Sequence, residues 1–151
     1  MKTLTLLISL ISLSSLFTFA QKQSASAHPE LNCENAQTTI DIDRCLGLEL
    51  DAAEEVLAIY LDKSKERYVG DQVLLDSIDK AQEAWLNYRQ AHCSSVFDKW
   101  RDGTIRNAMF LGCSTELTQQ RTVDIWRSFL TYGDSTPPLL PNPLESSIEL
   151  D

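Results

Sequence analysis

This chain of 151 residues is short of the side chains on which most catalytic and metal sites depend. It has only two histidines, His28 and His92. It contains no CxxC or HxxxH spacing, which would suggest a zinc site, and no glycine-rich loop that could hold a phosphate. His92 adjoins Cys93, but neighbouring residues on a helix point in different directions. The sequence therefore predicts no catalytic residue, no metal and no cofactor, and we expect a protein that is not an enzyme.

Basic residues are also scarce, since 13 Lys and Arg stand against 22 Asp and Glu and give a net charge of -9. Nucleic acids and anionic membranes attract clustered cations, so neither is an expected partner. An acidic surface does accelerate encounters with a basic protein. Because the same charge also serves solubility alone, composition leaves these two interpretations open.

Long apolar runs are absent except at the N-terminus. Lys2 provides a positive start, residues 4–17 are apolar with interspersed Ser and Thr, and Thr18-Phe19-Ala20 fits a small-x-small cleavage site. This pattern predicts a signal peptide over residues 1–20, with cleavage as late as residue 27 left open. The run is too short for a comfortable membrane span. We therefore expect an exported protein, periplasmic or extracellular, without a membrane contact after cleavage.

Three long segments carry apolar residues at helical spacing, and alternating strand patterns are absent. In the first segment, the apolar stripe steps by three or four residues from Ile42 to Leu61, after a capping Thr38 or Thr39 and before Gly70. We predict an all-α fold of three antiparallel helices, at about 39–67, 72–99 and 106–130.

The segments outside these helices are expected to be loose. A flexible leader is predicted over residues 21–32, before a helical domain over residues 33–132. Residues 133–151 contain four prolines and are predicted to form an extended, disordered tail.

The second helix contains the stretch Ala81–Cys93, around which we expect the others to pack. Trp85 and Tyr88 continue an apolar stripe from Ile78, which predicts that both aromatic rings fill the core. Arg89 and Arg121 lie on or beside the apolar sides of their helices. Their predicted role is also structural, with packed stems and guanidinium heads bonded to helix ends or carboxylates.

The four cysteines are even in number, which in an exported chain suggests two disulfides and allows three pairings. Cys93 and Cys113 flank the turn at Gly103 by ten residues each, so antiparallel helices bring them to the same height. The segment after Cys33 can double back along the first turns of the helix that holds Cys45. We therefore predict the pairs Cys33–Cys45 and Cys93–Cys113.

The connection between the second and third helices is the one basic stretch of this acidic chain. Lys99, Trp100, Arg101 and Arg106 lie there against a single Asp. Trp and Arg on a loop are common anchors in protein interfaces, so these four residues form a candidate partner-binding loop. The alternative is that Trp100 only ends the second helix and covers the core.

These motifs resemble the LprI-type lysozyme inhibitor family, a group of small secreted helical domains. The most specific match is Ala81-Gln82-x-Ala84-Trp85-x-x-Tyr88-Arg89-x-x-x-Cys93. Weaker matches lie on either side of it, and together they cover about residues 31–130. They are Cys33-x-x-Ala36-x-Thr38, then Cys45 and Tyr60, then Gly103-Thr104, and Cys113-x-x-x-x-Thr118-x-x-Arg121.

The chain departs from the family pattern at a few positions. It has Ala53 and Leu57 where the family tends to have Asp and Asn, Asp102-Gly103-Thr104 in place of Gly-Gly-Ser, and no lipid-anchoring cysteine.

The resemblance implies a secreted or periplasmic protein-binding module that inhibits a basic, lysozyme-like muramidase by occluding its cleft. Muramidase clefts carry two carboxylates, against which Arg101 or Arg106 would form charge-assisted hydrogen bonds. The alternative is an interaction or structural domain of the cell envelope, in the same family, that inhibits nothing.

Overall fold

A computed structural model gives the structure of this protein. The chain divides into two units, residues 1–30 and 31–151, and the structure describes residues 31–146. The predicted signal peptide and nearly all of the predicted leader lie outside the described residues, as do residues 147–151 of the predicted tail.

The described part of the chain is helical and contains no strand, as the sequence predicts. Three long helices are present, and the third continues into a π-helical segment, so the predicted helix boundaries are confirmed with that one refinement. In chain order the elements are η1 (Cys33–Asn35), α1 (Thr39–Arg67), α2 (Gln72–Lys99), α3 (Arg106–Ile125), the π-helix η2 (Trp126–Leu130) and the short α4 (Pro143–Ser146).

Side-chain caps begin the first two long helices. The Thr38 hydroxyl accepts a hydrogen bond from the backbone N–H of Asp41 at 3.1 Å, and the Asp71 carboxylate accepts one from the N–H of Leu74 at 3.0 Å. Each cap satisfies an N–H group that the first helical turn leaves without an intrahelical acceptor. Only four residues separate α1 from α2, so the two helices must run in opposite directions.

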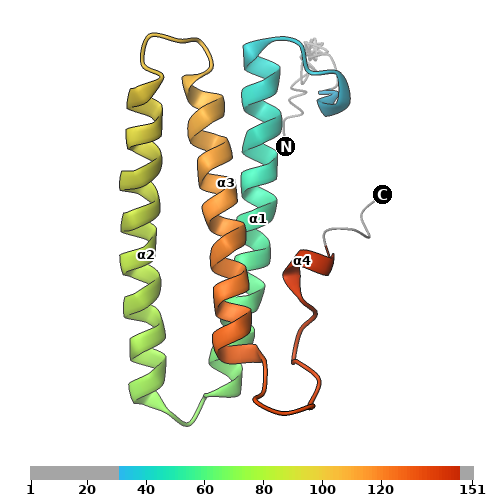
Figure 1. The fold of residues 1–151 in the computed structure, drawn as a ribbon, viewed down its shortest axis with the longest axis vertical. Coiled ribbons are helices and arrows are strands. Elements are labelled where there is room, and N and C mark those ends of the chain that lie inside the picture. Colours follow the sequence, from blue (N-terminus) through green and yellow to red (C-terminus); the bar gives the residue numbers. More distant parts are fainter. Residues whose placement is uncertain (1–30, 147–151) are drawn as a thin grey trace, which may run out of the picture. The chain divides into compact units, whose positions relative to one another are not determined.

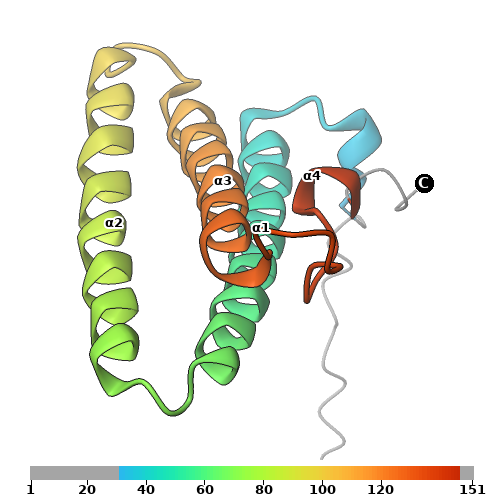
Figure 2. The ribbon, with the colours of Figure 1, turned by 60° about the horizontal axis from the view of Figure 1, so that its bottom comes forward.

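The helix α3 occupies the centre of the three-helix arrangement. It packs along both α1 and α2, whereas α1 and α2 make no comparable contact with each other. Figures 1 and 2 both show α3 between the other two helices. The helices therefore form a layer in the order α2, α3, α1, and each outer helix has only one long helix beside it.

The central helix is buried largely through hydroxyl side chains. Ser114, Thr115, Thr118 and Thr122 are all buried. The three threonine hydroxyls each donate to the carbonyl oxygen one turn earlier, at 2.7 to 3.1 Å, so their polar atoms have partners without water. Small side chains of this kind permit neighbouring helices to approach α3 closely on two sides.

An apolar cluster lies in the half of the molecule near the α1–α2 connection. Its buried members are Leu57 and Tyr60 of α1, Ile125 of α3 and Leu130 of η2. Partly buried side chains that pack against them are Leu61, Trp85, Trp126, Phe129 and Leu140. The predicted stripe of α1 therefore does face the core.

The C-terminal segment also belongs to this cluster. The backbone carbonyl of Leu140 accepts the indole N–H of Trp126 at 2.9 Å, and that of Pro141 accepts the Tyr60 hydroxyl at 2.8 Å. Over residues 133–146 the prediction of a disordered tail is therefore wrong. Proline lacks an N–H group but keeps its carbonyl, so a proline-rich segment can still dock as an acceptor.

Both predicted disulfides are confirmed. Cys33 and Cys45 lie 5.6 Å apart between Cα atoms, and Cys93 and Cys113 lie 5.7 Å apart. The first bond ties η1 to the start of α1, and the second ties the end of α2 to the start of α3. Both bonds lie in the half of the molecule that contains the α2–α3 loop.

Candidate functional site

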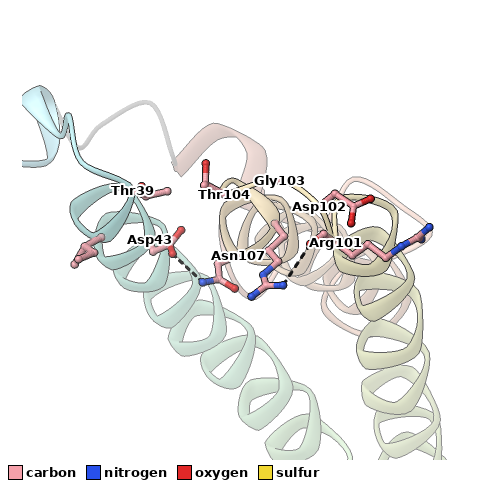
Figure 3. Close-up of a pocket in the computed structure, with 9 residues that line it drawn as sticks. Thr39, Asp43, Arg101, Asp102, Gly103, Thr104 and Asn107 are labelled. Carbon is pink, nitrogen blue, oxygen red and sulfur yellow. Dashed lines mark hydrogen bonds between the residues drawn. The ribbon is translucent and has the colours of Figure 1, made fainter.

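A shallow pocket opens between the start of α1 and the α2–α3 loop, with a volume of about 390 Å³. Figure 3 shows it with α1 on one side and the loop on the other. The pocket therefore joins the predicted basic loop to residues of α1 that lie about 60 positions earlier in the chain. Its lining residues are Thr39, Ile40, Asp43, Arg101, Asp102, Gly103, Thr104, Arg106 and Asn107.

A polar contact between α1 and α3 forms the base of this site. The Asn107 side-chain amide donates to Oδ2 of Asp43 at 3.0 Å, and the two side chains face each other in Figure 3. The second oxygen of Asp43, Oδ1, is buried and has no hydrogen-bond partner within residues 31–146. A buried acceptor without a donor carries a cost in free energy.

The two arginines of the predicted loop lie at the pocket but differ in their freedom. Arg101 is exposed and points away from Asp43 and Asn107 (Figure 3), with only a 3.3 Å contact from its Nη1 to the carbonyl of Asp98. Arg106 is the first residue of α3. Its guanidinium lies over the Phe97 ring at 5.1 Å and donates to the carbonyl of Arg101 at 3.4 Å. Of these two arginines, Arg101 is therefore the one that can reach outward.

The other two predicted loop residues do not line the pocket. Trp100 is half-buried and caps the end of α2, with the Lys99 ammonium 5.9 Å from its ring centroid. The alternative interpretation of Trp100, in which it ends the helix, thus matches its position.

Sequence reasoning missed Asp43 and Asn107 as parts of this site. Their contact depends on the packing of α1 against α3, and no pattern in the sequence around either residue predicts it.

A second polar cluster joins all three long helices around the stretch predicted to be central. Arg89 of α2 contacts the carboxylate of Glu54 on α1 at 2.7 Å and donates to the Thr118 hydroxyl on α3 at 2.6 Å. Arg121 donates from Nε to the Gln82 side chain at 3.1 Å. The Trp85 ring centroid lies 5.1 Å from the guanidinium of Arg89 and 5.9 Å from that of Arg121.

This cluster is a brace between helices. Burial lowers the pKa of Arg121, and the nearby charge of Asp124 partly offsets that effect. Each guanidinium head has a fixed partner, and the Trp85 ring packs against the apolar cluster. Trp85, Arg89 and Arg121 thus make contacts of the kind that structural residues make, and the roles assigned to them stay predictions.

Tyr88 departs from its prediction. Its side chain is 53% exposed and stacks on His92, with ring centroids 5.5 Å apart. The prediction that it fills the core is wrong, because α2 lies at an edge of the layer and only a narrow side of it is covered. Trp85 falls on that side and Tyr88 falls beyond it.

The described residues also limit the chemistry of the site. Within residues 31–146, no group of three or more His, Cys, Asp or Glu side chains is placed to hold a metal ion. The cysteines Cys33, Cys45, Cys93 and Cys113 are all in disulfides. No helix in this part of the chain combines the length and apolar character needed to cross a bilayer. Apart from Ile40 and Gly103, the residues that line the pocket have polar or charged side chains.

Comparison with known families gives the same assignment as the motifs. The model of the family described as lysozyme inhibitor LprI matches residues 32–125, more than half of the chain. The chain belongs to the LprI lysozyme inhibitor family. The LprI match spans both disulfides, the three long helices and the loop, and it ends before η2 and the docked C-terminal segment.

One curated relative and the solved structures complete the comparison. An uncharacterized protein of Rhizobium meliloti (strain 1021) is 27% identical over 108 residues, which cover 64% of this chain and 78% of that protein. No solved structure matches the chain. As a member of the LprI family, the protein is a lysozyme-inhibitor-like module built on three helices.

Proposed function

We propose that this protein inhibits a basic, lysozyme-like muramidase outside the cytoplasm, with the α2–α3 loop at the enzyme's cleft. The observation that carries the proposal is the LprI family match over residues 32–125. Two disulfides support the compartment, because such bonds persist in oxidising, extracytoplasmic environments.

Charge supports the choice of a basic partner. The chain has a net charge of -9, so long-range attraction speeds its encounter with a cationic enzyme. That attraction orients the approach without deciding the final contacts, which depend on close pairs. The salt dependence of association is therefore expected to be steep.

The loop supports a more specific contact. A muramidase cleft carries two carboxylates across the scissile bond, and a guanidinium binds a carboxylate through short, charge-assisted hydrogen bonds. Arg101 is exposed and directed outward, so it can reach such a group. Arg106 is held against Phe97 and the carbonyl of Arg101, which gives it the role of supporting the loop.

The test is a titration of muramidase activity with the purified, oxidised protein. We expect inhibition that weakens about tenfold in Arg101→Ala, as is typical when one charged interface anchor is removed. The matched control is Arg127→Ala, an exposed arginine at the opposite end of the molecule whose side chain makes no hydrogen bond or ion pair within residues 31–146.

The outcomes test the inhibitory function and the role of the loop separately. No inhibition at about 50 µM protein, a concentration far above that of a specific inhibitor, would remove the inhibitory function. The alternative of a non-inhibitory envelope module would then be favoured. Inhibition that is equal in Arg101→Ala and wild type would remove only the role of the loop.

A further inference from the structure

The helix α1 carries a second apolar stripe that nothing in the described structure covers. Leu48, Ala52, Val56 and Ile59 recur at helical spacing, and we refer to these four residues as the outer face of α1. Leu48, Val56 and Ile59 are 56%, 40% and 52% exposed, and Ala52 is exposed as well. A contiguous exposed apolar stripe of this kind marks an interaction surface more often than isolated apolar residues do.

The outer face is distinct from the side of α1 that builds the core. Ala53, Leu57 and Tyr60 are buried against the rest of the molecule, and their positions fall on another side of the helix. Since α1 lies at an edge of the layer, with α3 between it and α2 (Figure 2), its outer side has no helix of the layer against it. The docked C-terminal segment contacts α1 at Tyr60 and leaves the outer face exposed.

Unpaired carboxylates border the outer face. Glu49, Asp51, Glu55 and Asp62 are exposed, and none of them takes part in an ion pair in the described part of the chain. The two cations nearby are already engaged, since Arg44 lies 3.8 Å from Asp41 and Lys63 lies 2.9 Å from Glu66.

We propose that the outer face of α1 docks an amphipathic helix of a protein partner, with apolar side chains at its centre and Lys or Arg along both borders. The stripe spans three helical turns, which suits a helix laid along it. A second copy of this chain would bring like charges together, and an anionic membrane would be repelled in the same way. This inference does not rest on muramidase inhibition, because it concerns a different surface and any basic partner.

The experiment measures binding of a designed helical peptide to the full, oxidised chain. The probe has about 18 residues, long enough for a helix to form on binding, with leucines at helical spacing and lysines on both borders. A matched peptide has glutamates in place of the lysines. We expect the lysine peptide to bind and the glutamate peptide not to bind.

Two pairs of variants locate the contact. Val56→Lys/Ile59→Lys is expected to weaken binding at least tenfold, whereas Val69→Lys/Val73→Lys, with the same change of charge at residues 80% and 79% exposed, is expected to leave it unchanged. Glu55→Lys/Asp62→Lys is expected to weaken binding several-fold more than Glu83→Lys/Glu116→Lys, which changes two exposed carboxylates elsewhere. All of these side chains are exposed, and circular dichroism verifies that each variant is folded.

Several results would overturn the proposal. The first is failure of the lysine peptide to bind at about 100 µM, the upper range of weak specific binding. The second is equal binding of the lysine and glutamate peptides. The third is an equal loss of peptide binding in the variants of the outer face and in their controls. A dimer that Val56→Lys/Ile59→Lys dissociates would identify a second copy as the occupant. Failure of any of these tests leaves the muramidase titration unaffected, because the peptide assay contains no muramidase.

Discussion

The two ends of this molecule are held together by different means. The end that contains the α2–α3 loop carries both disulfides and the open pocket. The opposite end contains the apolar cluster of Leu57, Tyr60, Ile125 and Leu130, which the C-terminal segment covers through Leu140. Covalent bonds therefore predominate at one end and side-chain packing at the other.

This difference shows how a small domain can keep an open binding end. A core of this size supplies only limited stability, and packing concentrated at one end does little to order a distant loop. The Cys93–Cys113 bond fixes the helices that carry the loop, so the side chains around the pocket need not be apolar. The loop end is thus free to present charged groups such as Arg101 and Asp102.

The largest expected loss of stability comes from a substitution in the apolar cluster. Ile125 is 1% exposed and belongs to the apolar cluster. We expect Ile125→Ala to lower the free energy of unfolding by roughly 4 kcal/mol, from lost burial and the cavity left behind. Chemical denaturation measures this change, and Ile105→Ala, at an exposed isoleucine of the loop end, serves as control. Equal losses in the two variants would contradict the assignment of the core to one end.

A somewhat smaller loss of stability is expected when a disulfide is removed from the end that contains the α2–α3 loop. The Cys93–Cys113 bond closes a chain segment with a sequence separation of 20. Cys93→Ser/Cys113→Ser should cost about 3 kcal/mol, mainly because the unfolded chain gains freedom. Hydrogen exchange resolves where the loss appears, and we expect faster exchange in the α2–α3 loop than around Leu130. Protection that falls equally at both ends would mean that the ends are not held separately.

The sequence predicted the architecture well because local patterns decide it. Helical spacing, the caps at Thr38 and Asp71, and the even spacing of Cys93 and Cys113 about Gly103 each act over short distances. The central position of α3 was not predictable in the same way. Its buried side includes Thr118 and Thr122, which a search for apolar periodicity overlooks because it counts hydroxyl residues as polar.

The candidate site was predictable only in part. A basic loop in an acidic chain identified Arg101 and Arg106, and both line the pocket. The contact between Asp43 and Asn107 spans 64 positions in the chain and arises only after α1 and α3 have packed. The wrong prediction for Tyr88 has a related cause, since a stripe on one helix does not reveal how wide its covering will be.

The smallest expected effect concerns the C-terminal segment, residues 133–146, whose proline content wrongly predicted disorder. Tyr60→Phe removes the hydroxyl that donates to the carbonyl of Pro141 but keeps the aromatic ring in the core. We expect a loss of about 1 kcal/mol, the usual net contribution of one hydrogen bond. Chemical denaturation measures that loss. Increased proteolysis at residues 133–142 is also expected, with exchange in the α2–α3 loop unchanged.

The matched control for this last prediction is Tyr132→Phe, which alters a tyrosine outside the cluster whose hydroxyl makes no hydrogen bond within residues 31–146. If neither Tyr60→Phe nor Tyr132→Phe changes stability or proteolysis, the hydrogen bond from Tyr60 to Pro141 does not hold the C-terminal segment in place. Docking would then depend on Leu140 and on the hydrogen bond from the Trp126 indole N–H to the Leu140 carbonyl, whose two groups neither substitution removes. A selective loss in Tyr60→Phe, by contrast, would show that the apolar cluster extends beyond the third helix and is closed by a segment that docks through the carbonyl oxygens of Leu140 and Pro141.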